Sequence, residues 1–202
     1  MRATSRGAAI ALLLAAAALP AAAQHGLAFT VALGGTDVGG EWGNVFKGGV
    51  DADLNITYLL PSGVRFGGGV YFISYDLEPP LQDETVSNVE AHVIVGYVLG
   101  KGRLRPYGQA RLAYVRLRPE GHTFGSDTTG TGENAGPRRV GTGGTLVVGT
   151  EFAVTRHVAL DANAWTGAYT TDELDLSPIG GPAVKTGQTW GLRLGITWYA
   201  RP

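Results

Sequence analysis

The stretch VDADLNITYLL, residues 50–60, alternates apolar and polar side chains along its whole length. Leu54, Ile56 and Tyr58 fall on one parity, and Asp51 and Asp53 fall on the other. A period of two is that of a β-strand, because successive side chains of a strand point to opposite faces. The pattern predicts a strand with one apolar face and one charged face.

Seven further stretches alternate in the same way. They are residues 26–36, 64–75, 86–99, 104–117, 144–154, 158–169 and 187–200. Residues 60–63, 100–103 and 155–157 form tight turns between them, whereas the connectors 37–49, 76–85, 118–143 and 170–186 have 13, 10, 26 and 17 residues. Short turns at one end and long loops at the other are typical of outer-membrane barrels. We therefore predict an all-β fold, an eight-stranded antiparallel up-and-down transmembrane β-barrel.

Aromatic residues gather near the short turns of the predicted barrel. Those on the apolar parity predict an interfacial girdle of Tyr58, Phe66, Tyr97, Phe152 and Trp198. Phe72, Tyr114 and Trp190 can supply a second girdle at the loop end. Aromatic side chains favour the interfaces of a bilayer. We therefore expect the apolar parity to face lipid and the polar parity to face the lumen.

The polar parity collects charged residues of both signs. The predicted lumen network consists of Asp51, Asp53, Arg65, Glu90, His92, Arg111, Glu151, Asp161 and Arg193. The lumen of an eight-stranded barrel is just wide enough for side chains to fill. An isolated ion there is costly, so these charges should pair, with Arg65 and Arg111 as the expected partners of Asp53. The alternative is that these residues are the solvated face of ordinary strands.

The first 23 residues, MRATSRGAAIALLLAAAALPAAA, read as a secretory signal peptide. Arg2 and Arg6 precede an apolar run, and Ala21 and Ala23 form the A-x-A pattern of a cleavage site before Gln24. Residues 24–202 then form the barrel domain. Removing the two arginines leaves 14 basic residues against 17 acidic ones, a net charge near −3 that does not suggest a nucleic-acid partner. The chain has no cysteine, so its stability must come from hydrogen bonds and packing.

Candidate chemistry is sparse. His92 and Glu90 share the inward parity and could act as a base and its orienting group, but no matching serine lies nearby, and a lumen hydrogen bond is the simpler interpretation. Asp172, Glu173 and Asp175 match no EF-hand spacing and read as a solvated loop. The glycine-rich stretches lack the Gly-Lys of a phosphate-binding loop. We predict no catalytic, cofactor or metal site, and therefore no enzyme.

Three segments resemble a known family. LRPYGQARLAY (residues 104–114), VVGTEFAVTRHVALDANAW (residues 147–165) and GLRLGITWYA (residues 191–200) look like corresponding hairpins of small outer-membrane β-barrels of the outer membrane protein A or X type. The resemblance covers essentially the whole chain after the predicted signal. It implies an eight-stranded barrel in the outer membrane of a Gram-negative bacterium, in contact with lipid and inserted by the barrel-assembly machinery.

Fold class does not by itself name a function. The leading hypothesis is a monomeric, non-enzymatic structural or surface-interaction protein, whose four long extracellular loops bind a partner that the sequence does not name. A narrow ion-conducting pore through the charged lumen is one alternative. A secreted soluble barrel that binds a small hydrophobic ligand is another.

Overall fold

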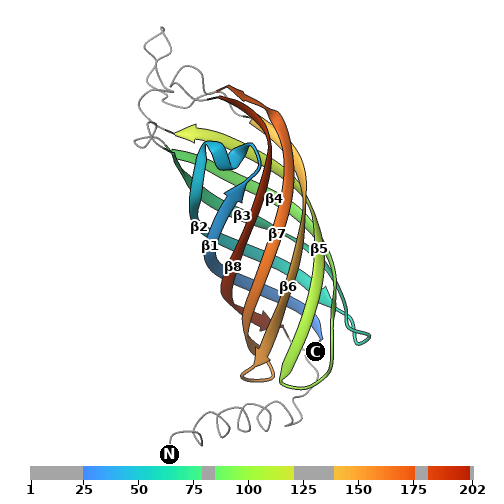
Figure 1. Cartoon of the computed structure of the whole chain (residues 1–202). Coiled ribbons are helices and arrows are strands. Elements are labelled where there is room, and N and C mark those ends of the chain that lie inside the picture. Colours follow the sequence, from blue (N-terminus) through green and yellow to red (C-terminus); the bar gives the residue numbers. More distant parts are fainter. Residues whose placement is uncertain (1–24, 79–84, 121–138, 176–181, 201–202) are drawn as a thin grey trace, which may run out of the picture.

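The computed structural model describes residues 25–78, 85–120, 139–175 and 182–200. Its strands close into one barrel in sequence order (Figure 1). They are β1 (Gly26–Gly39), β2 (Phe46–Leu59), β3 (Val64–Leu77), β4 (Thr85–Val98), β5 (Leu104–Glu120), β6 (Arg139–Ala153), β7 (Val158–Asp175) and β8 (Ala183–Tyr199). A single turn of 3₁₀ helix, η1 (Trp42–Asn44), lies between β1 and β2. Among the described residues, no helix is long and apolar enough to cross a membrane.

Every strand pairs antiparallel with its neighbours in the chain, and β1 closes the barrel on β8. The closing register runs from Ala28 opposite Tyr199 to Gly39 opposite Gln188. The predicted eight-stranded up-and-down barrel is therefore confirmed. Closure satisfies the backbone hydrogen bonds of every strand, which is what allows a β-structure to lie in a bilayer.

The short turns all lie at one end, the lower end in Figure 1. Gly63 and Gly100 occupy two of these turns with φ of +95° and +78°, a left-handed backbone conformation that glycine adopts without steric cost. At the other end the strands run further than the sequence pattern predicts. Residues 37–39 and 46–49 are strand rather than connector, as are 76–77, 118–120, 139–143, 170–175 and 183–186.

These extensions have a physical reason. Val38, Leu77, Leu174 and Val184 lie in them and are buried, so alternation with inward apolar residues continues past the predicted ends of the strands. The first connector, residues 40–45, is correspondingly shorter than the 13 residues predicted. The predicted signal peptide and most of the predicted 118–143 loop lie outside the described residues.

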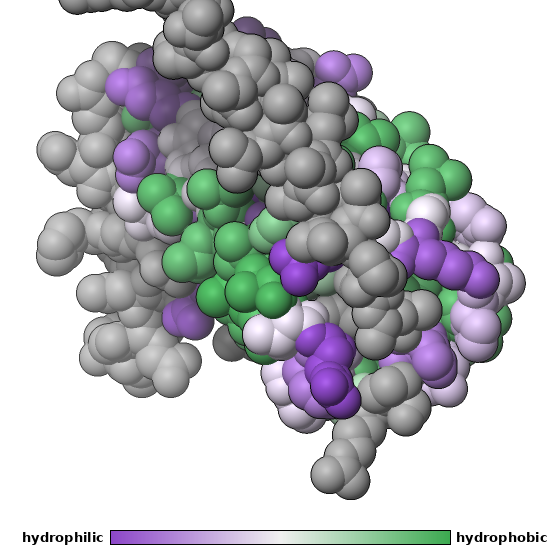
Figure 2. Space-filling model, turned by 90° about the horizontal axis from the view of Figure 1, so that it is seen from below, coloured by the Kyte–Doolittle hydropathy of each residue, from purple (hydrophilic) through white to green (hydrophobic). Residues whose placement is uncertain are grey.

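The two faces of the sheet differ in polarity. Outward residues such as Leu33, Leu112 and Leu194 are 61–72% exposed, whereas Asp51 and Asp53 are 1% exposed. Seen from below, hydrophobic side chains form a broad group on the visible face, with hydrophilic residues beside it (Figure 2). An apolar exterior around a charged interior is the reverse of a soluble barrel and matches the lipid-facing parity predicted from the sequence.

Neighbouring residues of β2 test this parity. Leu54 is 40% exposed on the outer wall, so Leu54→Arg should lower the free energy of unfolding by roughly 2 to 4 kcal/mol, because a charge must leave the bilayer interior. Leu54→Val is the matched control and should cost far less. Denaturant unfolding of the refolded proteins in lipid vesicles gives both values. Tolerance of arginine at position 54 would mean that this face is in water.

Candidate functional site

The middle of the lumen holds a cluster of paired charges contributed by β2, β5 and β8. Arg193 donates to both aspartates of β2, from Nε to Asp51 Oδ1 at 2.6 Å and from Nη1 to Asp53 Oδ2 at 3.2 Å. Arg111 Nη2 lies 2.8 Å from Asp53 Oδ2. Thr36 Oγ1 donates to the second oxygen of Asp51 at 2.6 Å. All of these side chains are buried, so the ion pairs act at low dielectric.

The guanidinium of Arg193 also lies against two aromatic rings that meet edge to face. Its central carbon lies 4.5 Å from the ring centroid of Tyr71 and 4.3 Å from that of Trp165. Cation–π contacts of this kind are strongest where water is excluded. Arg193 therefore connects the carboxylates of β2 to the aromatic layer formed by β3 and β7.

His92 completes this layer from β4. Its Nδ1 lies 3.2 Å from Glu90 Oε1, and its Nε2 lies 2.8 Å from Asn55 Oδ1. Glu90 Oε2 accepts a hydrogen bond of 2.9 Å from the Tyr169 hydroxyl. A Cβ on Gly69 would come within 2.8 Å of His92 Nε2, so glycine at this position leaves room for the imidazole ring.

A second charged cluster lies nearer the short turns. Glu151 accepts from Arg65, from Arg105 Nη2 at 2.6 Å and from the Tyr199 hydroxyl at 2.7 Å. The side chain of Glu151 is 0% exposed. The carboxylate of Glu151 thus lies between two guanidinium groups, and the hydrogen bond from Tyr199, the last residue of β8, helps to orient it.

Asp161 lies beside this cluster and accepts hydrogen bonds from neutral groups. Its Oδ1 accepts hydrogen bonds from Asn163 Nδ2 at 2.6 Å and from the Tyr107 hydroxyl at 3.2 Å. Arg65 stacks on the Tyr107 ring at 5.2 Å. Neutral donors therefore hydrogen-bond this carboxylate, and the guanidinium of Arg65 lies nearby on the Tyr107 ring.

The loop end of the lumen is closed by aromatic rings. Trp42 of η1 stacks on Tyr169 with centroids 5.7 Å apart and meets Phe46 and Tyr75 edge-on at 6.0 and 6.2 Å. We call Trp42, Phe46, Tyr75 and Tyr169 the aromatic plug. Val38, Leu77, Leu117, Leu174 and Val184 are buried in the same apolar cluster. A residue of the first connector thus fills part of the lumen at the loop end.

Very little space remains between these layers. A cavity of about 10 Å³ lies among Asp53, Arg65, Tyr107, Arg111 and Asp161. That volume holds about one water molecule. Side chains therefore fill the lumen between the apolar layer at the loop end and the two ionic layers below it, whereas a cavity of about 140 Å³ borders Arg105 at the short-turn end.

The structure places all nine residues of the predicted lumen network inside the barrel. The expected pairing of Asp53 with Arg65 is wrong, because Arg65 contacts Glu151 while Asp53 contacts Arg111 and Arg193. Sequence reasoning also missed Arg105, although it shares the parity of Tyr107 and Arg111. The buried charges of the described residues are thus five carboxylates, four guanidinium groups and His92.

The residues of the predicted girdle lie on the outer wall. Tyr58, Phe66, Tyr97 and Trp198 are 43–48% exposed, and Phe152 is partly exposed. Tyr58 and Phe66 face each other across β2 and β3 with ring centroids 5.8 Å apart. Trp198 makes a similar contact of 5.7 Å with Phe29, which the sequence reading had not assigned to the girdle.

Glu41 holds the first connector to β8. Its Oε2 accepts from the backbone N–H of Lys185 at 2.8 Å and of Thr186 at 2.9 Å. These two hydrogen bonds stabilise the carboxylate and hold the pKa of Glu41 below its ordinary value of 4.5. Because Glu41 directly precedes Trp42, the contact fixes the entry of the aromatic plug.

This contact predicts a pH dependence. A lowered carboxyl pKa stabilises the contact above the ordinary value of 4.5 and loses that effect as the pH falls through the lowered pKa. Hydrogen-exchange protection factors of the Lys185 and Thr186 amides should therefore drop at acid pH. Glu41→Gln, which keeps an acceptor but cannot titrate, should remove the pH dependence. Equal acid sensitivity in both proteins would contradict this assignment.

Among the described residues, no group of three or more histidine, aspartate or glutamate side chains could hold a metal ion. The His92–Glu90 pair is enclosed in the lumen behind the aromatic plug, with side chains 0% and 3% exposed.

A closed antiparallel barrel with an apolar exterior and an ionic interior defines a transmembrane β-barrel of the bacterial outer membrane. The family model described as outer membrane protein beta-barrel domain matches residues 7–197. The chain belongs to this family. A search of curated proteins finds no match.

The likeness to Neisserial surface protein A supports the fold. The crystal structure of Neisserial surface protein A matches with a TM-score of 0.59 and 18% identity, over 86% of this chain and 97% of that chain. The N-terminal β-barrel domain of Pseudomonas aeruginosa OprF matches at 0.48 and 16%, over 87% and 98%. Ail, the attachment invasion locus protein of Yersinia pestis, matches at 0.47 and 14%, over 86% and 99%.

Proposed function

We propose that the protein is a sealed, non-conducting barrel that anchors extracellular connectors at the cell surface for interaction with a partner. The filled lumen is the observation that carries this proposal. Ions need a continuous aqueous path, and the aromatic plug and the two ionic layers occupy the cross-section of an eight-stranded barrel. The same observation argues against the narrow-pore alternative, and enclosure of the His92–Glu90 pair argues against an enzyme.

Planar-bilayer recording tests the sealed lumen. The wild-type protein should insert without producing stepwise conductance. The double variant Trp42→Ala/Arg193→Ala, which removes one large side chain from the plug and one from the ionic layer, is the comparison that shows whether a path can be opened. Reproducible conductance steps from the wild-type protein would overturn the proposal and favour the pore.

Binding through the connectors is tested separately. Because β5 ends at Glu120 and β6 begins at Arg139, residues 121–138 can be replaced by Gly-Asn-Gly without cutting into either strand. Loop length affects closure entropy weakly, so the variant should still give a folded barrel that migrates differently before and after boiling. Loss of host-cell or matrix adhesion by cells that display this variant, at equal surface levels, supports a surface-interaction role. Unchanged adhesion by the variant, or no adhesion by the wild type, would count against it.

A further inference from the structure

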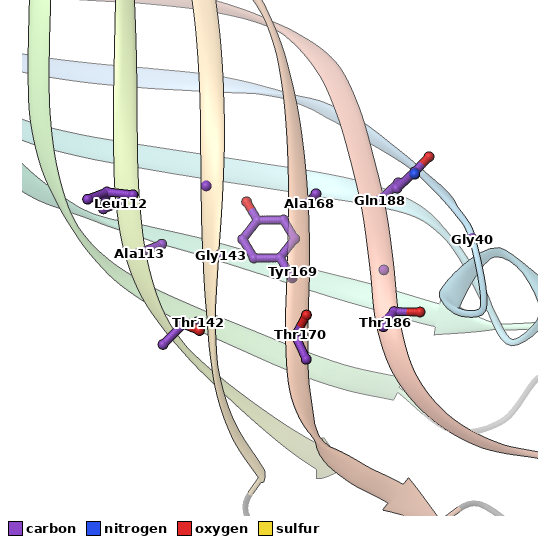
Figure 3. Close-up of a pocket in the computed structure, with 12 residues that line it drawn as sticks. Gly40, Leu112, Ala113, Thr142, Gly143, Ala168, Tyr169, Thr170, Thr186 and Gln188 are labelled. Atoms are coloured by element: carbon purple, nitrogen blue, oxygen red, sulfur yellow. The ribbon is translucent and has the colours of Figure 1, made fainter.

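The outer wall carries a depression near the loop end that the sealed lumen does not explain. It has a volume of about 790 Å³ and lies across β5 to β8 (Figure 3). Thr142, Thr170 and Thr186 lie side by side across β6, β7 and β8, since the register pairs Thr142 with Thr170 and Thr170 with Thr186. Leu112 of β5 borders the depression and is 71% exposed.

Small residues form the floor of this depression. In the register that starts at Leu112, the next two residues are Gly144 and Ala168. Because these side chains are small, the barrel wall is thin at this point, and the inward-facing ring of Tyr169 also lines the depression. The site therefore combines an apolar floor and border with a row of hydroxyl groups on the side nearer the loop end.

Two arginines lie beyond the depression on the same outward face of β5. Arg116 and Arg118 follow Leu112 by four and six residues, and a strand rises about 3.4 Å per residue, so they lie roughly 14 and 20 Å further toward the loop end. Their register neighbours facing outward are uncharged: Val89 and Val140 flank Arg116, and Ser87 flanks Arg118. Tyr114 lies between the arginines and the depression.

We propose that this face binds a phosphorylated lipid of the outer leaflet, with an acyl chain in the depression and a phosphate at Arg116 and Arg118. The order of features along β5 is the order of groups in such a lipid: apolar surface at Leu112, an interfacial aromatic ring at Tyr114, then two cations. Guanidinium groups bind phosphate by charge-assisted hydrogen bonds, and basic residues at a membrane surface attract anionic headgroups. The site is independent of the proposed surface-interaction function.

Native mass spectrometry of the detergent-solubilised protein tests the phosphate half of the site. The probes are lipid A and the same lipid with its phosphates removed. Arg116→Gln/Arg118→Gln should weaken binding of lipid A about tenfold or more and leave binding of the dephosphorylated lipid unchanged. The matched control Arg103→Gln/Arg156→Gln removes the same charge near the short turns and should leave both affinities unchanged. Equal losses in the two variants, or no loss in the first, would overturn the proposal.

Gly144→Leu tests the acyl half. The nearest atom to a Cβ at position 144 is 3.7 Å away, so leucine is accommodated there and fills the depression. Binding of both lipids should fall, whereas Gly35→Leu, at an outward glycine with open space around it, should change neither. Unchanged binding to Gly144→Leu would overturn the assignment of the depression.

Two measurements on the wild-type protein keep the test decisive if a variant folds poorly. Lipid A binding should weaken when the salt concentration is raised from 50 to 500 mM, and binding of the dephosphorylated lipid should not. Inorganic phosphate at millimolar concentration should fail to displace lipid A. Displacement by free phosphate would mean that the arginines bind a soluble anion rather than a lipid.

Discussion

Replacing Glu151 by glutamine is expected to lower the free energy of unfolding by about 3–5 kcal/mol. The substitution keeps the size of the side chain but removes the negative charge that lies between Arg65 and Arg105. Both guanidinium groups are buried, with 6% and 4% of their side chains exposed, and they would share an uncompensated positive charge. Denaturant unfolding of the refolded barrel in lipid vesicles measures the loss.

Glu173→Gln is the matched control. Glu173 pairs with Lys185 at 2.8 Å, but both side chains are more than half exposed. Exposed pairs contribute about 0 to 1 kcal/mol, so this variant should stay close to wild type. Adding Arg105→Gln to Glu151→Gln should recover part of the loss, because one unpaired charge is removed. Similar stabilities for Glu151→Gln and Glu173→Gln would show that the charged cluster around Glu151 is solvated.

Trp42→Ala is expected to have a comparable effect, about 3–5 kcal/mol. Trp42 is 0% exposed, and its ring contacts Phe46, Tyr75 and Tyr169, so alanine leaves a large cavity at the loop end. Trp42→Phe should lose less because it refills part of that space. Chemical unfolding followed by the fluorescence of the remaining tryptophans gives the stability of each variant.

The same variant should remain non-conducting. The ionic layer formed by Asp51, Asp53 and Arg193 lies below the plug and is untouched by the substitution. Trp198→Ala, on the outer wall, is the control of equal size and should cost less. A Trp42→Ala barrel as stable as wild type would mean that η1 contributes little to closing the mouth.

Parity and connector length were sufficient to predict the barrel. Alternation fixes which residues share a face, and the position of Arg105 on the inward face of β5 could have been predicted from the same rule. Pairing within the lumen could not be predicted, because it depends on which residues meet across the barrel. Arg65 is adjacent to β2 in the sheet, yet its carboxylate partner is Glu151 of β6, on the far side.

The aromatic plug was missed for a different reason. Trp42 and Phe46 lie in a stretch rich in glycine and charge, which reads as a solvated connector. Their burial depends on Tyr75 of the neighbouring strand β3 and on Tyr169 of β7, which is distant along the chain. The composition of this stretch cannot predict the contact of Trp42 with Tyr169, which lies more than 100 positions further along the chain. Apolar residues at Val38, Leu77 and Val184 were the available indication that the strands continue.

Pairing of β1 with β8 has a consequence for biogenesis. The first strand finds one of its two partners in the last strand to be synthesised, and Tyr199 reaches Glu151 only through that final strand. Until β8 arrives, β1 presents an open edge, and such edges promote aggregation. Contacts between the two ends of the chain also form slowly. A chain whose barrel has not yet closed therefore needs protection from other copies before it reaches the outer membrane. A chain truncated before β8 would lack the β1–β8 pairing and the hydrogen bond from Tyr199 to the buried carboxylate of Glu151.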